Sequence, residues 1–294
     1  MTWMTWSMPT ITCSRLACGL ALLIVGLATP TSEAQTKFNS GQNVQPVFEG
    51  WEKNPDGSFN FLFGYLNRNY RERPHVPVGP NNHFSPGDGD RGQPSHFYPR
   101  RQNYMFKVRV PADFGDQDLV WTVTHAGRSD TAVGSLWPVW EVDEAVIKAN
   151  RGMGVSGSYV DNHGPNIGLD GPDTHAVSVG TAVTLIVVAG DDGIPGPNLE
   201  AAERRGNRRG RPGPDQQNIL NPRAAVARGL SVTWLQHRGP APVSFSPMMP
   251  PLENGRASTI ASFTAPGTYV LRAVADDTVL TAAVDVTVVV APAN

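Results

Sequence analysis

The sequence predicts an all-β protein built from two β-sandwich domains. Apolar residues alternate with polar ones in several short runs, and Gly, Pro or Asp residues end these runs. The chain also contains 30 glycines and 26 prolines, which interrupt helices and mark turns. The one stretch that could form a helix, residues 142–149, could equally be a strand.

The N-terminus carries the features of an export signal. Arg15 precedes an apolar stretch, Leu16 to Ala28, that is too short to cross a bilayer. The small residues Ser32 and Ala34 then place cleavage after Ala34. Residues 1–34 are therefore predicted to be a signal peptide of the general secretory route. We expect the mature chain to be secreted or periplasmic and to have no transmembrane segment.

The cysteine content and the net charge limit the kinds of function that the sequence predicts. Cys13 and Cys18 both lie in the predicted signal peptide, so the mature chain has no thiol, disulfide or cysteine metal ligand. Cys18 stands at the start of the apolar stretch rather than after it, so we do not expect lipidation. The net charge of the whole chain is -2, and it stays so because Arg15 and Glu33 leave together. Such a charge does not indicate binding to nucleic acid or to an anionic membrane.

The first domain is expected over residues 35–150. A polar turn, 111–118, separates the alternating runs at 104–110 and 119–123, so these two runs are expected to pair as neighbouring strands. Their aromatic side chains are expected to fill a core rather than to form a ligand platform. The runs are Phe59, Phe61, Phe63 and Tyr65; Tyr104, Phe106, Val108 and Val110; and Leu119, Trp121 and Val123.

A long loop, residues 67–101, separates the first two of these runs. Loops of this length are functional or disordered. Four aromatic residues would hold this one on the sandwich, so we expect it to be ordered and to be the main candidate for a functional surface in the first domain. These residues are Tyr70, Phe84, Phe97 and Tyr98. His75, His83 and His96 also lie in it, with Asp88 and Asp90, but their spacing matches no zinc or copper motif, which favours solvated side chains.

The second domain is expected over residues 177–292, after a Gly- and Pro-rich linker, 151–176, and with an Arg-rich insertion, 196–228. The insertion lacks interleaved aromatic residues, so nucleic-acid binding is not expected. Trp234 falls on a central strand, and Tyr269 follows a Gly turn, as in the tyrosine corner of immunoglobulin-like sandwiches. We expect Trp234 to be buried against Leu185 and Tyr269. The alternating runs lie at 183–189, 230–234, 268–275 and 284–290.

Several short motifs in this second domain are similar to those of a known family. They are Val183-Thr184-Leu185, Asp191-Asp192-Gly193-Ile194-Pro195, Leu230-Ser231-Val232-Thr233-Trp234, Gly267-Thr268-Tyr269-Val270-Leu271-Arg272 and Ala275-Asp276-Asp277. The domain resembles the PKD-like, Ig-fold modules of bacterial exported proteins. It departs from them at the insertion and at Thr278, where Gly is commoner. The resemblance implies a spacer or adhesive module and brings no catalytic residues. The first domain is similar to uncharacterised exported bacterial β-sandwich domains, which imply no activity.

Four carboxylates form the candidate metal site. In an Ig-like sandwich the strands that end near Asp191 and Asp192 and near Asp276 and Asp277 finish at the same pole. Carboxylate oxygens are hard ligands that suit Ca²⁺, so calcium is a possible cofactor. The alternative is that these residues cap turns and face water, as Asp before Gly often does.

The sequence contains none of the common catalytic motifs. It has no nucleophile elbow, no His-Glu-x-x-His, no phosphate-binding glycine loop and no dinucleotide fingerprint. It therefore favours a non-enzymatic protein of the cell envelope or extracellular space that acts in binding, adhesion or structural spacing, with a protein or glycan partner. The alternative is an accessory carbohydrate-binding protein or a hydrolase whose site lies in the 67–101 loop.

Overall fold

The computed structural model describes residues 37–150, 161–196 and 229–293. The predicted signal peptide and nearly all of the Arg-rich insertion lie outside these residues. Phe38–Asn294 belong to one compact unit, and its described elements are almost all strands, which confirms the all-β prediction. The helical elements described are η1 (Pro138–Trp140) and α2 (Glu144–Asn150), so the ambiguous stretch 142–149 is mostly helical. Neither is long and apolar enough to cross a membrane.

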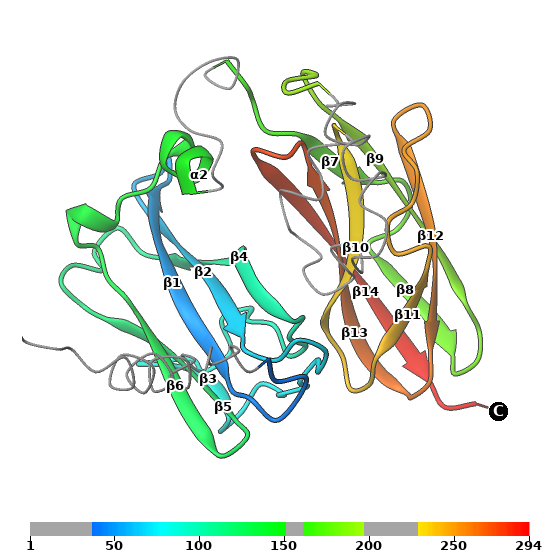
Figure 1. Ribbon diagram of the computed structural model, residues 1–294, viewed down its shortest axis with the longest axis horizontal. Helices are drawn as coiled ribbons and strands as arrows, with labels where there is room; N and C mark the ends of the chain where they lie inside the picture. Colours follow the sequence, from blue (N-terminus) through cyan, green and yellow to red (C-terminus); the bar gives the residue numbers. More distant parts are fainter. Residues whose placement is uncertain (1–36, 151–160, 197–228, 294) are drawn as a thin grey trace, which may run out of the picture. The chain divides into compact units, whose positions relative to one another are not determined.

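The first sandwich consists of two three-stranded sheets (Figure 1). One has the order β1-β2-β4 and the other β3-β5-β6. The strands are β1 (Val44–Lys53), β2 (Phe59–Asn67), β3 (Asn82–Ser85), β4 (Arg100–Val110), β5 (Leu119–His125) and β6 (Arg128–Gly134).

The expected pairing of the strands on either side of the 111–118 turn is wrong. Strand β4 pairs with β2, whereas β5 pairs with β3 and β6 in the other sheet. The connection crosses between the sheets, so that the apolar faces of both strands meet in one core. Phe106 of β4 and Trp121 of β5 accordingly lie with ring centroids 5.0 Å apart.

Aromatic residues fill this first core, as the sequence predicts. Trp121 is fully buried and its ring lies 5.9 Å from those of Phe63 and Phe84. Phe84 and Phe97 come from the 67–101 loop, which is therefore held on the sandwich by its own side chains. Part of this loop forms β3, the edge strand next to β5.

The second sandwich has sheets of order β10-β13-β14-β8 and β11-β12-β9-β7. Strands β7 and β8 lie at the sheet edges, and β7 and the first three residues of β8 fall in the linker predicted at 151–176. Strand β7 pairs antiparallel with β9, and β8 pairs parallel with β14. The strands are β7 (Asn166–Leu169), β8 (Thr174–Ser178), β9 (Val183–Gly190), β10 (Ser231–Arg238), β11 (Val243–Ser246), β12 (Arg256–Phe263), β13 (Gly267–Asp276) and β14 (Thr281–Ala291).

Two features identify this sandwich as Ig-like. Trp234 of β10 is fully buried in the same core as Leu185 and Tyr269, as expected. The Tyr269 hydroxyl donates a hydrogen bond to the backbone carbonyl of Ala265 at 2.8 Å, which forms the tyrosine corner. Gly239 lies beside that ring with φ of +150°, and a Cβ there would be 2.2 Å from Tyr269 Cδ1. Only glycine fits this position.

Strand β10 is buried on both faces. Strand β12 alternates between buried and exposed residues, as a strand with one face on a core should, but the interior of β10 is buried throughout. Val232 and Trp234 belong to the second core, whereas Leu235 and the β13 residue Val274 pack with the first. The outer face of the β10–β13 pair is therefore covered by the first sandwich.

Candidate functional site

The 67–101 loop binds directly to the backbone of β10. The Tyr98 hydroxyl accepts a hydrogen bond from the amide of Gln236 at 2.8 Å. The Ser95 amide donates to the carbonyl of His237 at 3.0 Å, and the His237 Nε2 atom is 2.8 Å from the carbonyl of Gly92. The loop that the sequence selects as a functional surface therefore forms an interface within the chain.

Arg238, at the end of β10, adds a charged contact to this interface. Its Nε atom donates to the carbonyl of Gln93 at 2.7 Å. Its two terminal nitrogens lie 3.0 and 2.6 Å from the carboxylate oxygens of Asp90. The hydrogen bonds from Arg238 lower the pKa of Asp90. Such paired, charge-assisted hydrogen bonds fix orientation as well as adding energy.

Buried tyrosines connect this interface to the first core. The Tyr65 hydroxyl of β2 accepts a hydrogen bond from the backbone amide of Tyr98 at 2.9 Å. Burial raises the pKa of Tyr98 to about 12, so its phenol is neutral. A continuous chain of hydrogen bonds thus runs from β2 through Tyr98 to Gln236 on β10.

The loop histidines do not converge on a metal. His96 is buried edge-on against Tyr98, with ring centroids 4.9 Å apart, and burial lowers its pKa to about 3. His75 pairs with His96 through a backbone bridge, and Asp90 is engaged by Arg238. Within the described ranges, no group of three or more His, Cys, Asp or Glu side chains is arranged to hold a metal ion.

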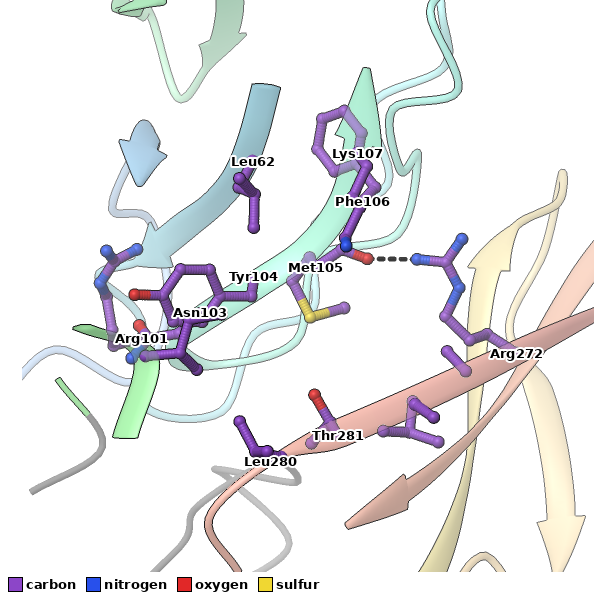
Figure 2. A pocket seen from close by; sticks show the side chains of 14 residues that line it. Leu62, Arg101, Asn103, Tyr104, Met105, Phe106, Lys107, Arg272, Leu280 and Thr281 are labelled. Atoms are coloured by element: carbon purple, nitrogen blue, oxygen red, sulfur yellow. Dashed lines mark hydrogen bonds between the residues drawn. The ribbon is translucent and has the colours of Figure 1, made fainter. Parts of the chain in front are cut away.

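A cleft of about 560 Å³ lies where β2 and β4 face β13 and β14 (Figure 2). Such a volume is typical of pockets for small ligands. Its walls combine apolar side chains with three cationic ones, and Figure 2 shows Arg272 donating to the carbonyl of Met105 across it. Its lining includes Leu62, Arg101, Met105, Lys107, Arg272 and Leu280.

Each cation of the cleft has an acidic partner. Arg101 lies 3.0 Å from Glu49 and Lys107 lies 2.5 Å from Glu52. Arg272 makes two hydrogen bonds to Asp285, of 2.7 and 2.8 Å. Burial raises the pKa of Glu49, and the neighbouring Arg101 guanidinium opposes that rise. The cleft is therefore polar but largely charge-balanced.

A distorted part of β4 forms one wall of the cleft. Tyr104 has φ of 51°, and the register between β2 and β4 shifts here. Gly64 lies opposite, where a Cβ would be 2.4 Å from the carbonyl oxygen of Gln102. The Nη1 atom of Arg101 and the Oδ1 atom of Asn103 are buried without hydrogen-bond partners. Backbone strain and unpaired polar atoms of this kind concentrate at binding sites.

At the acidic pole, all four aspartates cap turns, as in the alternative prediction, but Asp276 and Asp277 are buried and do not face water. Each accepts a hydrogen bond from a backbone amide two residues later. The pairs are Asp191–Gly193, Asp192–Ile194, Asp276–Thr278 and Asp277–Val279, at 3.1, 2.8, 2.7 and 2.6 Å.

The contacts around these carboxylates differ. Burial raises the pKa of Asp277, and the charge of Asp191 raises it further. The other oxygen of Asp192 is occupied, because it accepts the amide of His163 at 2.7 Å, and that hydrogen bond lowers the pKa of Asp192. The structure thus relates Asp191 to Asp277 and assigns Asp192 to the segment at 163.

An apolar segment around η1, which the sequence did not single out, is exposed. The exposed fractions of Trp137, Val139 and Trp140 are 68%, 79% and 46%. Large apolar side chains that gather on a surface often mark interaction sites. Nothing in the local pattern distinguishes these tryptophans from core residues, so the sequence could not have identified them.

No family model and no curated protein sequence matches the chain. Solved structures that it resembles include domains 4 and 5 of the S-layer protein SbsC, at 12% identity and a TM-score of 0.26, over 60% of this chain and 66% of that one. The fibronectin(III)-like modules of Clostridium thermocellum CbhA match at 9% identity and a TM-score of 0.23, over 84% and 95%. Titin domains Z1Z2 in complex with telethonin match at 14% and 0.24, over 85% and 98%. TM-scores this low do not support a fold assignment, so the Ig-like fold is assigned from the sheet order and the tyrosine corner.

Proposed function

We propose that this chain is an exported, non-enzymatic protein that acts in binding, adhesion or structural spacing at the cell envelope. The observation that supports this most strongly is the attachment of the 67–101 loop to β10. Two domains joined only by a Gly-rich linker would move independently. Here hydrogen bonds and shared apolar packing link the two sandwiches, which supports the fixed separation that a spacer or presenting module requires. The resemblance of the second domain to PKD-like modules fits the same role.

The polar groups of the 67–101 loop support binding over hydrolysis. The Asn82 side chain donates to the carbonyls of Val76 and Pro94 at 2.9 and 2.8 Å. The Gln93 side chain donates to Gly89 at 2.7 Å. These side chains stabilise the loop itself, and a buried neutral His96 is poorly placed to exchange protons with a substrate. The cleft and the exposed tryptophans offer surfaces for a protein or glycan partner.

We expect the two sandwiches to keep one fixed separation in solution. The mature chain has no cysteine, so spin labels can be placed at Thr131→Cys and Ser258→Cys, which are exposed positions on β6 and β12. Pulsed electron resonance should give one narrow distance distribution. Arg238→Ala should broaden it, because the contacts with Asp90 and Gln93 are lost.

The matched control is Arg256→Ala, which removes an ion pair with Asp170 inside the second sandwich. This variant should leave the distance distribution unchanged. A broad distribution in the unsubstituted chain would contradict the spacer proposal.

A second prediction concerns export. The chain recovered from the exported fraction should begin at Gln35, and intact-mass spectrometry should show no lipid. Recovery of a chain acylated at Cys18 would contradict the proposed secretory processing, since acylation would anchor the protein to a membrane.

A further inference from the structure

Three buried oxygen atoms near the Asp277 turn lack hydrogen-bond donors. Asn162 is 1% exposed, and its Nδ2 atom donates to Oδ2 of Asp277 at 3.1 Å. The Oδ1 atom of the same amide is buried without a partner. Oδ1 of Asp191 and the hydroxyl of Thr278 are also buried and unpartnered. Leaving a buried acceptor unpaired is unfavourable, so these atoms require a partner.

These oxygens come from three separate segments that meet in the fold. Asn162 precedes β7, Asp191 follows β9, and Asp277 and Thr278 lie in the turn between β13 and β14. The hydrogen bond between Asn162 and Asp277 joins two of these segments, and the hydrogen bond from the His163 amide to Asp192 brings the residue after Asn162 to the residue after Asp191. The charge of Asp191 also raises the pKa of Asp277. All of them can present acceptor oxygens, and acceptors that face acceptors need a cation or a donor between them.

The Lys148 side chain contacts this segment, but its ammonium group is engaged by other oxygens. The Lys148 Nζ atom donates to the backbone carbonyl of Asn162 at 2.9 Å and lies 3.6 Å from Glu144. On the other side of this segment, the amide of His163 donates to Asp192. These contacts hold the backbone at 162–163 in place without pairing the free oxygens.

Thr278 has a backbone conformation that favours glycine. Its φ is +88°, which is strained for a β-branched residue. Strain of this kind persists mainly where a side chain has a role. A threonine here supplies a hydroxyl that glycine would not, beside the turn that carries Asp277.

We propose that Asp191, Asp277 and Asn162 form a Ca²⁺ site, with the Thr278 hydroxyl as a further oxygen ligand. Rotation of the Asn162 amide would present Oδ1 in place of Nδ2, and the orientation of such an amide is set by its partners. Calcium accepts mixed carboxylate and amide oxygens in irregular geometry, whereas Mg²⁺ demands a near-ideal octahedron. The site uses two carboxylates rather than the four expected from the sequence. Both oxygens of Asp192 already accept backbone amides, whereas Oδ1 of Asp191 has no partner.

The proposed site also adjoins the cleft. Oδ1 of Asp277 accepts the amide of Leu280 at 2.6 Å, and Leu280 lines the cleft wall. A cation held by Asp277 would therefore stabilise one wall of the candidate binding surface.

The test is isothermal titration of the full mature chain with CaCl₂, together with calorimetric melting in calcium and in chelator. Calcium at about 100 times its dissociation constant should raise the melting temperature by about 5–10 °C. Asp191→Asn and Asp277→Asn should each abolish this rise, and Asn162→Ala should reduce it. The matched control is Asp192→Asn, which should keep the full calcium-dependent rise.

Some results would overturn the site. The proposal is contradicted if the unsubstituted chain melts identically in calcium and in chelator and shows no heat of binding. This result does not depend on whether any variant folds. Retention of the full rise in Asp191→Asn would also contradict the proposal. An equal rise in MgCl₂ would overturn the assignment to calcium.

Discussion

Replacing Trp234 with alanine should lower the free energy of unfolding by about 3–5 kcal/mol. The indole is fully buried between the sheets of the second sandwich, in the core that contains Leu185 and Tyr269. Alanine leaves a cavity that close-packed neighbours can fill only in part. The measurement is urea denaturation of the mature chain followed by circular dichroism. An unchanged midpoint would contradict the position of Trp234 in this core.

Phenylalanine is the informative control at this position. The indole Nε1 atom of Trp234 is buried without an acceptor. Trp234→Phe removes this unsatisfied donor and keeps much of the apolar volume, so it should cost clearly less than alanine. Equal losses from the two substitutions would show that filling the core is not the reason for the tryptophan.

The sequence predicts best those strands whose buried positions alternate along the chain. The run at 183–189 forms most of β9, in which every second residue is buried. Strands β7 and β8 are short and lie at sheet edges, so their residues carry no such pattern. Their existence depends on pairing with β9 and β14, which local sequence does not record.

The interface between the sandwiches could not be predicted for a related reason. Gln236 and His237 are polar yet buried, and their partners are Tyr98 and Gly92, more than a hundred residues away in the sequence. Polar residues in a strand normally indicate a solvent-exposed face. Only the folded chain shows that a second layer covers this face.

The fold topology predicts only part of the candidate calcium site at the acidic pole. The Ig-like pattern predicts that Asp191 and Asp192 lie near Asp276 and Asp277, because the preceding strands end at the same pole. It does not show which carboxylate oxygens are already used in turns. Asn162 lies in a polar segment that the sequence assigns to the linker, so nothing marked it as part of a site.

In the first sandwich, Trp121→Ala should also cost about 3–5 kcal/mol. The Trp121 ring contacts Phe84 and Phe106, and its Nε1 atom donates to Oδ1 of Asn82 at 2.9 Å. The alanine variant therefore loses both apolar contacts and a buried hydrogen bond. Urea denaturation again measures the loss, and Trp121→Phe, which retains most of the ring contacts, should lose less.

The same substitution tests whether the sandwiches are coupled. Phe84 and Phe97 of the 67–101 loop rest on Trp121, and this loop in turn binds Gln236 of β10. Loosening the loop should therefore weaken the second sandwich, and hydrogen exchange followed by mass spectrometry should show faster exchange in β10 as well as in β5. If the two domains were independent, β10 would keep its normal protection from hydrogen exchange in the Trp121→Ala chain. That outcome would leave the 67–101 loop as a local feature of the first sandwich and remove the main support for a rigid spacer.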